Sequence, residues 1–373
     1  MAERYRVLSL DGGGMRGIYT AAYLHGLIDS FSHRRNVEYL DLGKGFDLIV
    51  GTSTGAMIAC ALAAGVRMDR VVGLYREYGP RIFEQPVYDG LKVVLNFFGR
   101  RSRLQRGAKA LEEGLTGIFG QTTIGELYAR RGIALAIPTV ELSRHRAFVF
   151  KSAHLGGDRD DNTRLVDACL ASSAAPVFRS LASFKPADGL DPPRVFADGG
   201  LWANNPVLVG MLDALRATAR ETEIDIFAMG TCPRPEGEHV DSADLDRSLY
   251  DWRFGAKAAQ LGIAAQETAF DHMARLLANE LHRHGRAVNV CRFPSDKVAA
   301  SVMPYLDLDN TSKAAMDALV GQARTDVDIT KSRCDDAKDS EGGAILRLFN
   351  AIPEMKKDQE NARYFRPDPE ILQ

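Results

Sequence analysis

The sequence lacks both a long hydrophobic run and a segment that would direct the chain out of the cell. A membrane-spanning helix needs roughly 18 or more apolar residues in a row, and the 373 residues contain no such run. The charged start of the chain lacks the apolar stretch and small-residue cleavage site of a signal peptide. We therefore expect a cytoplasmic protein; whether it also acts peripherally at the inner face of a membrane depends on residues considered below.

Paired cysteines and metal-binding spacings are also missing. No Cys-x-x-Cys motif or Cys/His cluster occurs, and the five cysteines are odd in number and scattered: Cys60, Cys169, Cys232, Cys291 and Cys334. This usage is typical of reduced thiols and argues against a structural zinc site. We predict small buried thiols in most of these places, and neither a metal nor a cofactor.

The chain has little net charge and no internal repeat. The formal charge is −2, which gives no indication of a nucleic-acid polymer as partner. Hydrophobic residues make up 45% and charged residues 26%, as in ordinary soluble globular proteins. With no clean linker, we predict one domain over residues 1–373, with a motif-bearing core over about 5–232 and a helical elaboration over about 250–373. The oligomeric state stays open, with a homo-oligomer as one possibility.

Two strand–turn–helix units at the start predict βαβ construction. Apolar strands over 6–10 and 46–50 are each followed by a glycine-rich turn and then by a helix that begins near residue 18 or 56. This order predicts an α/β fold with three layers, α/β/α, around a central and mostly parallel sheet. Further strands are expected over 133–140, 147–150, 194–197, 224–229 and 288–293, helices over 163–171, 206–219 and 254–284, and an exposed polar loop over 334–343.

The segment Gly51–Gly55 reads Gly-Thr-Ser-Thr-Gly and has the GxSxG form of a nucleophilic serine. Its place between a strand and a helix is the context that this form requires. The glycines allow a sharp turn that exposes Ser53 at the head of a helix, where free N–H groups favour a developing oxyanion. A serine between glycines can also be a plain helix cap. We interpret Ser53 as a candidate catalytic nucleophile.

A second glycine-rich loop, Asp11–Gly17, follows the first strand. The successive glycines Gly12, Gly13 and Gly14 leave backbone N–H groups uncovered, and such groups can bind an oxyanion. Arg16 can fix this loop by bonding carbonyl groups, or can add positive charge near the oxyanion. The loop also contains the dinucleotide fingerprint GxGxxG, which makes a nucleotide-binding oxidoreductase a rival reading. That rival lacks a clearly placed acidic residue after a second strand, and it leaves the GxSxG segment unexplained.

A general base for Ser53 is the remaining requirement. The later histidines are poor candidates, because none of them ends a strand before a turn: His239, His272, His282 and His284. Asp198 is the better candidate, since it ends an apolar strand and is followed by two glycines. A carboxylate can take the serine proton directly if it lies within hydrogen-bonding reach and is partly desolvated. The alternative for Asp198 is an ordinary Asp-Gly turn.

Together, these segments resemble the patatin-like phospholipase family. That family reads DGGGxRG at its first strand, GxSxG at the nucleophile and DG[AG] at the catalytic aspartate, and here the three motifs occur in the same order at 11–17, 51–55 and 198–200. The resemblance continues in Ser172–Phe178 and Asn204–Pro206, and it covers roughly residues 5 to 232. It departs at Cys232, where family members commonly have glycine, and we expect a packing difference there.

The resemblance implies a mechanism and a substrate class. It implies a Ser–Asp dyad without a catalytic histidine, in which Ser53 is the nucleophile and Asp198 the proton acceptor. It implies Gly12, Gly13 and Gly14 as oxyanion-hole donors, with Arg16 in the same loop. The expected reaction is phospholipase A type hydrolysis of membrane phospholipids through an acyl-enzyme. A non-catalytic lipid-binding or storage protein is the second rival.

The form of the first motif and the compact length look most like bacterial members of the family. Some of those are effectors of antiphage defence that cyclic dinucleotides, such as cyclic GMP-AMP, switch on to degrade the cell's own membrane. No residue of this sequence proves such a switch, so nucleotide activation is a hypothesis that rests on family analogy alone.

An apolar segment beside a basic cluster is the candidate membrane contact. Residues 87–98 are rich in Val, Leu and Phe, and residues 99–106 contain four arginines. Such a combination suits an anionic bilayer surface. The same residues can instead form a lid over the site, or a core helix with a solvated basic end.

Overall fold

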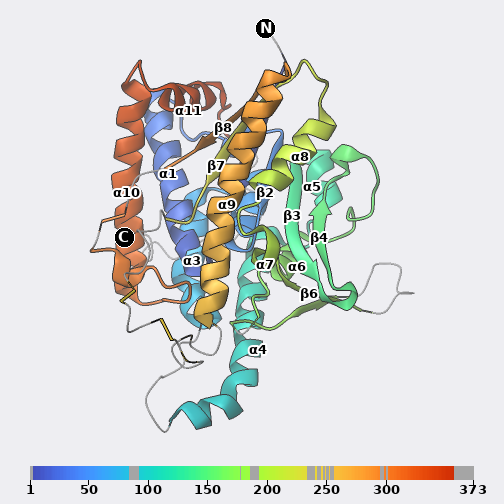
Figure 1. Ribbon diagram of the computed structural model, residues 1–373, viewed down its shortest axis with the longest axis vertical. Coiled ribbons are helices and arrows are strands. Elements are labelled where there is room, and N and C mark those ends of the chain that lie inside the picture. Colours follow the sequence, from blue (N-terminus) through green and yellow to red (C-terminus); the bar gives the residue numbers. More distant parts are fainter. Residues whose placement is uncertain are drawn as a thin grey trace.

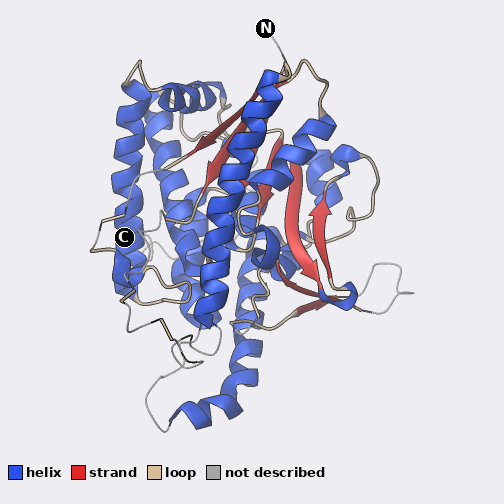
Figure 2. Cartoon of the chain, viewed as in Figure 1, coloured by secondary structure: helices blue, strands red, loops and turns tan. Residues whose placement is uncertain are grey.

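The computed structural model of the chain has one sheet with helices on both sides (Figure 1; Figure 2). It describes residues 3–83, 92–176, 178–184, 193–232, 256–294 and 301–356, together with a few residues between 240 and 252 and at 298–299. The predicted fold class, a three-layer α/β/α arrangement around a mostly parallel sheet, is confirmed.

The sheet has eight strands in the order β5-β6-β3-β2-β1-β7-β8, with β4 beside β3. Strands β3, β2, β1, β7 and β8 run parallel to one another, whereas β4 and β6 run antiparallel to β3, and β5 runs antiparallel to β6. The strands are β1 (Arg4–Leu10), β2 (Leu48–Gly51), β3 (Ala134–Glu141), β4 (Arg146–Lys151), β5 (Ala182–Phe184), β6 (Arg194–Asp198), β7 (Glu223–Met229) and β8 (Val288–Arg292).

Each face of the sheet is covered by its own set of helices. Val7 and its neighbours on one face pack against α8 and α9, while Leu8 and its neighbours on the other face pack against α1, α2 and α3. Burial on both faces is why β2 is apolar along its whole length and why β1 and β7 are mainly apolar toward their carboxyl ends. The helices are α1 (Gly17–Arg34), α2 (Thr54–Ala64), α3 (Met68–Ile82), α4 (Lys92–Phe119), α5 (Ile124–Arg131), α6 (Leu165–Ser172), α7 (Gly200–Ala203), α8 (Val207–Ala217), α9 (Ala256–Arg283), α10 (Lys313–Asp335) and α11 (Ser340–Ala351).

The predicted strands and the three later predicted helices agree with the observed ones to within two residues at each end. The loop predicted over 334–343 is confirmed only in its middle. Residues 336–339 connect α10 to α11 and residues 335–338 are exposed, but α10 continues to Asp335, α11 begins at Ser340, and Cys334 and Gly342 are buried. The polar residues that suggested a longer loop also stabilise the ends of the two helices. The Asp339 side chain accepts a hydrogen bond from the Gly342 N–H at the start of α11 and pairs with Arg333.

Strand pairing brings two distant strand ends together. Ala136 of β3 pairs with both Val50 and Lys151, and Thr139 of β3 pairs with both Asp198 and Phe148. Since β4 occupies one edge of β3, both β2 and β6 lie along the other edge and share it. Strand β2 is parallel to β3 and β6 is antiparallel, so their carboxyl ends point toward each other. This register sets the turn after β2 beside the end of β6.

No described helix is long and apolar enough to cross a membrane. Most of the candidate membrane segment, residues 87–106, lies outside the residues whose side chains the structure describes. Residues 87–91 are not described, and the side chains of residues 92–100 in the first turns of α4 are not described either. The three readings of residues 87–106 therefore stay as predictions.

Candidate active site

Ser53 lies on a strained turn between β2 and α2. Its backbone has φ 55° and ψ −117°, a conformation that non-glycine residues rarely adopt and that is found at functional sites. The flanking glycines are needed for close approach. A Cβ atom on Gly51 would lie 2.3 Å from the Gly55 carbonyl oxygen, and one on Gly55 would lie 2.3 Å from the Leu10 carbonyl oxygen. The GxSxG spacing thus lets the turn pack directly on itself and on β1.

Asp198 lies within hydrogen-bonding distance of Ser53. The Ser53 Oγ donates to Asp198 Oδ2 at 3.0 Å, and the Gly200 N–H donates to Asp198 Oδ1 at 2.6 Å. Burial raises the pKa of the Asp198 carboxyl from 3.8 to about 6, while the two hydrogen bonds and the positive charge of Arg179 oppose that rise. A carboxylate in this state is a stronger base than an exposed aspartate and is still ionised at neutral pH.

Ser172 holds the Ser53 turn in place, and the sequence had suggested no such role. Its Oγ accepts a hydrogen bond from the Ser53 N–H at 2.8 Å and donates one to the Pro138 carbonyl at 2.7 Å. The hydroxyl therefore connects the strained turn to β3 from the C-terminal end of α6. The signal was present, because Ser172 begins the small-residue segment that belongs to the family resemblance, but no motif says which atom it bonds.

The glycine loop faces the same site, but fewer of its backbone N–H groups are available to bind an oxyanion than the sequence predicted. The Gly12 N–H donates to the Asn204 carbonyl at 2.9 Å. In contrast, the amides of Gly13 and Gly14 have no hydrogen-bond acceptor within the described part of the chain. The same holds for the amide of Thr54, which opens α2 directly after Ser53. The amides of Gly13, Gly14 and Thr54 are thus the candidates for binding an oxyanion.

Two contacts fix the conformation of the glycine loop. Gly14 has a φ of +55°, where a side chain would be strained, and the Met15 N–H next to it donates to the Leu308 carbonyl at 2.8 Å. Arg16 is buried at the start of α1 and lines the cavity in front of Ser53. Its part in catalysis stays a prediction.

A buried ion pair anchors the start of the same loop. Asp11 Oδ2 accepts hydrogen bonds from both Nη1 and Nη2 of Arg292 at 2.9 Å, and Arg292 Nε donates to Asp271 at 2.9 Å. Burial raises the pKa of Asp11, and the Arg292 guanidinium opposes that rise. Sequence reasoning missed Arg292, because it is 281 residues from Asp11 and belongs to no recognised motif.

A cavity of about 200 Å³ opens in front of Ser53 and Asp198. Its walls are mainly apolar, and they come from both the motif-bearing segments and the C-terminal part of the chain. Such a lining suits an acyl chain whose ester bond lies at Ser53. The apolar wall residues are Met15, Met57, Leu74, Ile82, Phe83, Leu111, Pro176, Phe178, Leu201, Ile263 and Leu308.

None of the histidines in the described part of the chain lines this cavity. His272, His282 and His284 are exposed on α9, and His239 lies outside the described residues. The five cysteines are free and buried. Among the described residues, no group of three or more His, Cys, Asp or Glu side chains is placed to hold a metal ion.

The backbone conformation at Cys232 gives a physical reason for the glycine that family members commonly have at this position. Cys232 has a φ of 81°, in the left-handed region where glycine is unstrained and other residues are not. The thiol is buried, and burial raises its pKa to about 12. The chain therefore has a buried cysteine in a backbone conformation that glycine would adopt without strain.

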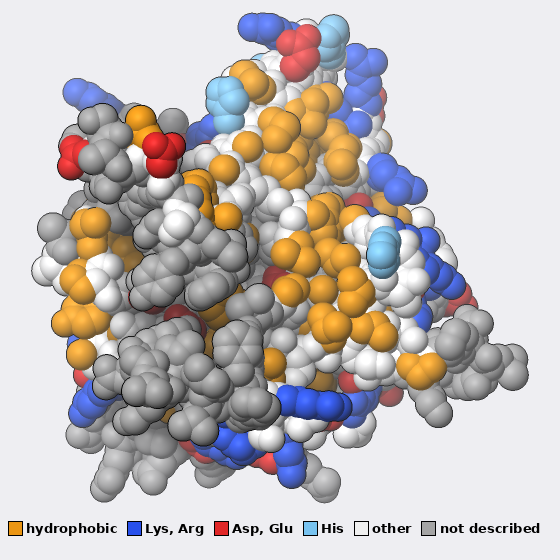
Figure 3. Space-filling model, turned by 60° about the horizontal axis from the view of Figure 1, so that its bottom comes forward, with side chains coloured by type: hydrophobic (Ala, Val, Ile, Leu, Met, Phe, Trp, Pro, Cys, Tyr) orange, Lys and Arg blue, Asp and Glu red, His pale blue; other side chains and the backbone are white. Residues whose placement is uncertain are grey.

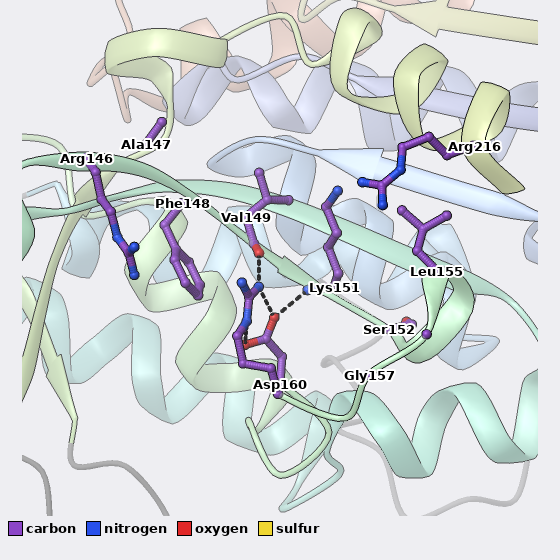
Figure 4. Close-up of a pocket in the computed structure, with 12 residues that line it drawn as sticks. Arg146, Ala147, Phe148, Val149, Lys151, Ser152, Leu155, Gly157, Asp160 and Arg216 are labelled. Carbon is purple, nitrogen blue, oxygen red and sulfur yellow. Dashed lines mark hydrogen bonds and ion pairs between the residues drawn. The ribbon is translucent and has the colours of Figure 1, made fainter.

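A second cavity of about 400 Å³ lies beside β4 and shares no lining residue with the first (Figure 4). Two of its basic side chains already bond carboxylates. Lys151 donates to Asp213 at 2.6 Å and Arg159 donates to Asp160. These pairs satisfy the cations inside the protein, so we assign this cavity no ligand.

The fold and the site define the class of the protein. A strained serine between β2 and α2, a buried carboxylate bonded to its hydroxyl, and a loop of free amides are the features of a serine hydrolase on an α/β scaffold. A model of the patatin-like phospholipase family matches residues 8–211. The chain belongs to that family, and the protein is a serine hydrolase of the phospholipase class.

The chain is similar to named proteins along most of its length. It is 30% identical to a cGAMP-activated phospholipase of Vibrio cholerae over 87% of this chain and 90% of the other. It is 36% identical to a cGAMP-activated phospholipase of Pseudomonas aeruginosa over 73% of this chain and 74% of the other. Human GIVD cytosolic phospholipase A2 matches with a TM-score of 0.42 and 11% identity over 93% of this chain and 60% of that one, which is too low to support a functional argument.

Proposed function

We propose that the protein releases fatty acids from membrane phospholipids with Ser53 as nucleophile and Asp198 as proton acceptor. The observation that carries this proposal is the 3.0 Å hydrogen bond from Ser53 Oγ to the buried Asp198 carboxylate, at the head of α2. The apolar cavity beside the pair supports an acyl ester as substrate. The proposed sites agree with the order of motifs in the family to which the chain belongs.

The first half of the reaction forms an acyl-enzyme. Ser53 Oγ attacks the ester carbonyl carbon while its proton passes to Asp198 Oδ2, and the carbonyl π electrons move to the oxygen. The resulting oxyanion accepts hydrogen bonds from the amides of Gly13 and Gly14, and losing one such donor typically costs about two to three orders of magnitude in rate. The tetrahedral intermediate then breaks its bond to the glycerol oxygen, which takes the proton from Asp198.

The second half repeats the same proton transfers with water. Asp198 accepts a proton from a water molecule as the water oxygen attacks the acyl carbon. Collapse of the second tetrahedral intermediate breaks the bond to Ser53 Oγ, which recovers its proton from Asp198, and a fatty acid is released. One residue thus serves as base and then as acid in each half of the cycle.

We further propose that a cyclic dinucleotide such as cyclic GMP-AMP activates the hydrolase, as an effector that degrades the cell's own membrane in antiviral defence. Support comes from the two relatives named cGAMP-activated phospholipases, which this chain matches over most of their length. The nucleotide-binding oxidoreductase reading is not favoured, because the family assignment accounts for the glycine loop without a dinucleotide cofactor.

The test is phospholipid hydrolysis by the purified protein. Fatty-acid release from phosphatidylglycerol–phosphatidylethanolamine vesicles is measured with and without a panel of cyclic dinucleotides, beside Ser53→Ala. We expect release by the wild type only, with a large increase for one nucleotide. No release by the wild type under any condition would reject hydrolysis and favour a lipid-binding or storage protein. Full activity that no nucleotide changes would reject activation alone.

Peripheral contact with the membrane is the remaining part of the proposal. Hydrophobic side chains gather in patches on the face that Figure 3 shows, and exposed leucines occur near the cavity. Leu201 of α7 lines the cavity and is 51% exposed, and Leu261 of α9, beside the cavity residue Gln260, is 59% exposed. Leu261→Ser should reduce co-sedimentation with anionic vesicles more than Ile329→Ser on α10. Equal binding by both variants would contradict this contact.

A further inference from the structure

Arg179 is a buried cation that has no hydrogen-bond or ion-pair partner among the described residues. The residue is only 8% exposed, and its Nε is buried without an acceptor in the described part of the chain. Within that part, the charged group that acts on Arg179 is the Asp198 carboxylate, and the two side chains form no ion pair.

Such an arrangement is costly unless a ligand completes it. Burial lowers the pKa of Arg179 to about 10, so the side chain still carries its charge at neutral pH. Buried charges in proteins are normally paired or hydrogen-bonded, because an uncompensated one loses several kcal/mol of hydration free energy. A guanidinium presents donors in a planar fork that fits a phosphate in two parallel hydrogen bonds. The missing partner is therefore expected to be an anion.

The position of Arg179 in the cavity restricts the kind of anion that can bind it. It lines the same cavity as Ser53 and Asp198, among apolar side chains. An anion there has to be attached to an apolar molecule whose ester reaches Ser53. We have assigned the oxyanion formed in the reaction to the amides of Gly13 and Gly14, so it does not account for Arg179.

We propose that Arg179 binds the head-group phosphate of the glycerophospholipid while its acyl ester lies at Ser53. This inference rests on the proposed function and adds the basis of substrate choice. Arg179 then selects lipids with a phosphate over neutral acylglycerols that carry the same chains. The Pro176–Arg179 turn can place it there, because the Arg179 N–H bonds the Ala175 carbonyl at 2.8 Å and the Asp198 N–H bonds the Ala174 carbonyl at 3.0 Å.

The test compares two substrates in the same detergent micelles, a phosphatidylglycerol and a diacylglycerol with identical chains. Assays are run at pH 8, well above the pKa of about 6 that Asp198 has in the wild type, and with the activating nucleotide if the wild type requires one. For Arg179→Gln we expect the ratio of kcat/KM for the phospholipid to kcat/KM for the neutral lipid to fall about 10- to 100-fold, the range for a charge-assisted hydrogen-bonded pair. Arg179→Lys should recover part of the ratio, and Arg216→Gln, an exposed arginine on α8, should not change it.

Inorganic phosphate and glycerol 3-phosphate distinguish a bound head group from a general anion site. Both are tested as inhibitors of neutral-lipid hydrolysis by the wild type and by Arg179→Gln. Stronger inhibition by glycerol 3-phosphate that disappears in the variant supports the head-group site, whereas inhibition equal in both proteins rejects it. Folding is checked by thermal unfolding, with Arg179→Met as a second variant that removes the charge and keeps the apolar contacts.

The outcomes separate this inference from the proposed function. If the wild type hydrolyses both lipids and Arg179→Gln loses both equally, Arg179 acts only through Asp198 or the local fold, and the head-group role is wrong. If the wild type hydrolyses neither lipid and behaves as Ser53→Ala does, the proposed function itself fails.

Discussion

Ser53 and Asp198 are both held in conditions that cost stability. Ser53 has a backbone conformation worth about 1–3 kcal/mol of strain, at φ 55° and ψ −117°. Asp198 carries a charge in a site that is only 7% exposed. In the proposed mechanism each cost is useful for catalysis, because the turn exposes the hydroxyl and burial strengthens the carboxylate as a base. Activity and stability are therefore expected to trade against each other at these two residues.

The pH dependence of turnover should follow the Asp198 carboxyl. The carboxylate is the form that accepts the Ser53 proton, and burial raises its pKa to about 6. The logarithm of kcat/KM should rise by about one per pH unit up to pH 6 and then level off, so that activity at pH 5 is about a tenth of that at pH 8. The measurement is the pH profile with a soluble ester substrate. A flat profile down to pH 5 contradicts a base at this position.

Asp198→Asn should be inactive and more stable than the wild type. The folded-state pKa of about 6 is above the ordinary value of 3.8, so ionising Asp198 costs folding free energy as the pH rises through this window. Asparagine has no such cost, and the gain should be about 1–3 kcal/mol at pH 8. The difference should be much smaller at pH 4, and it should vanish at a pH well below 3.8, where the carboxyl is protonated in both states.

Urea unfolding at pH 8 and pH 4 measures this difference, and turnover of the same samples gives the loss of activity. Asp198→Asn should fall about as far as Ser53→Ala, roughly 10⁴-fold, because the two residues act as one unit. Near-normal turnover by Asp198→Asn would remove the dyad from the mechanism.

At the scale of elements, the site depends on two strands that share one edge of β3. Strand β2 ends at Gly51 and β6 ends at Asp198, and their opposite directions along β3 bring the two ends together. Helix α6 supports the junction through Ser172. The separation of 145 residues between Ser53 and Asp198 is bridged by strand register and not by any local turn.

Ser172→Ala should weaken this junction measurably. Both groups that the hydroxyl bonds, the Ser53 N–H and the Pro138 carbonyl, would lose their partner in a buried place. The cost of such orphaned groups is about 1–3 kcal/mol, read from urea unfolding. Ser173→Ala is the matched control, because the hydroxyl of Ser173 bonds only the Cys169 carbonyl of its own helix. Equal destabilisation by the two variants would show that Ser172 has no special role.

At the scale of the whole molecule, the C-terminal part of the chain packs against the segments that carry the sequence motifs and forms part of the cavity wall. Strand β8 extends the sheet beside β7, α10 packs against α1, and Gln260 and Ile263 of α9 line the cavity. The Leu308 carbonyl and the Arg292 guanidinium both bond the glycine loop. We propose on these contacts that the chain folds as a single unit. An activator bound to the C-terminal part would then have a direct physical route to the oxyanion donors.

Arg292→Met tests this connection. It leaves the buried Asp11 carboxylate without its partner, so we expect a loss of about 3–5 kcal/mol in stability, part of which Asp11→Asn should restore in the double variant. Because the glycine loop acts on the transition state, kcat should fall more than KM rises. Arg275→Met is the control, since Arg275 bonds Asp271 in the same network without reaching Asp11. Equal effects of the two variants on kcat contradict the anchoring role.

The sequence by itself determined the parts of this protein that depend on local structure. Apolar strands buried on both faces are recognisable from their residues, and glycine spacing marks both loops because only glycine permits the close approaches at Gly51 and Gly55. The same reasoning overestimated the loop at 334–343, where only residues 336–339 lie outside the helices α10 and α11.

Only the tertiary structure decided which atoms are paired. The Gly12 amide bonds the Asn204 carbonyl, Asp11 is paired with Arg292, and Arg179 is buried without a partner among the described residues. No sequence motif predicts these features, because each depends on contacts between segments that are far apart in the sequence. Burial raises the pKa of Asp198, and it leaves the Arg179 charge in a place where a bound anion would stabilise it. Both properties depend on how distant segments pack together.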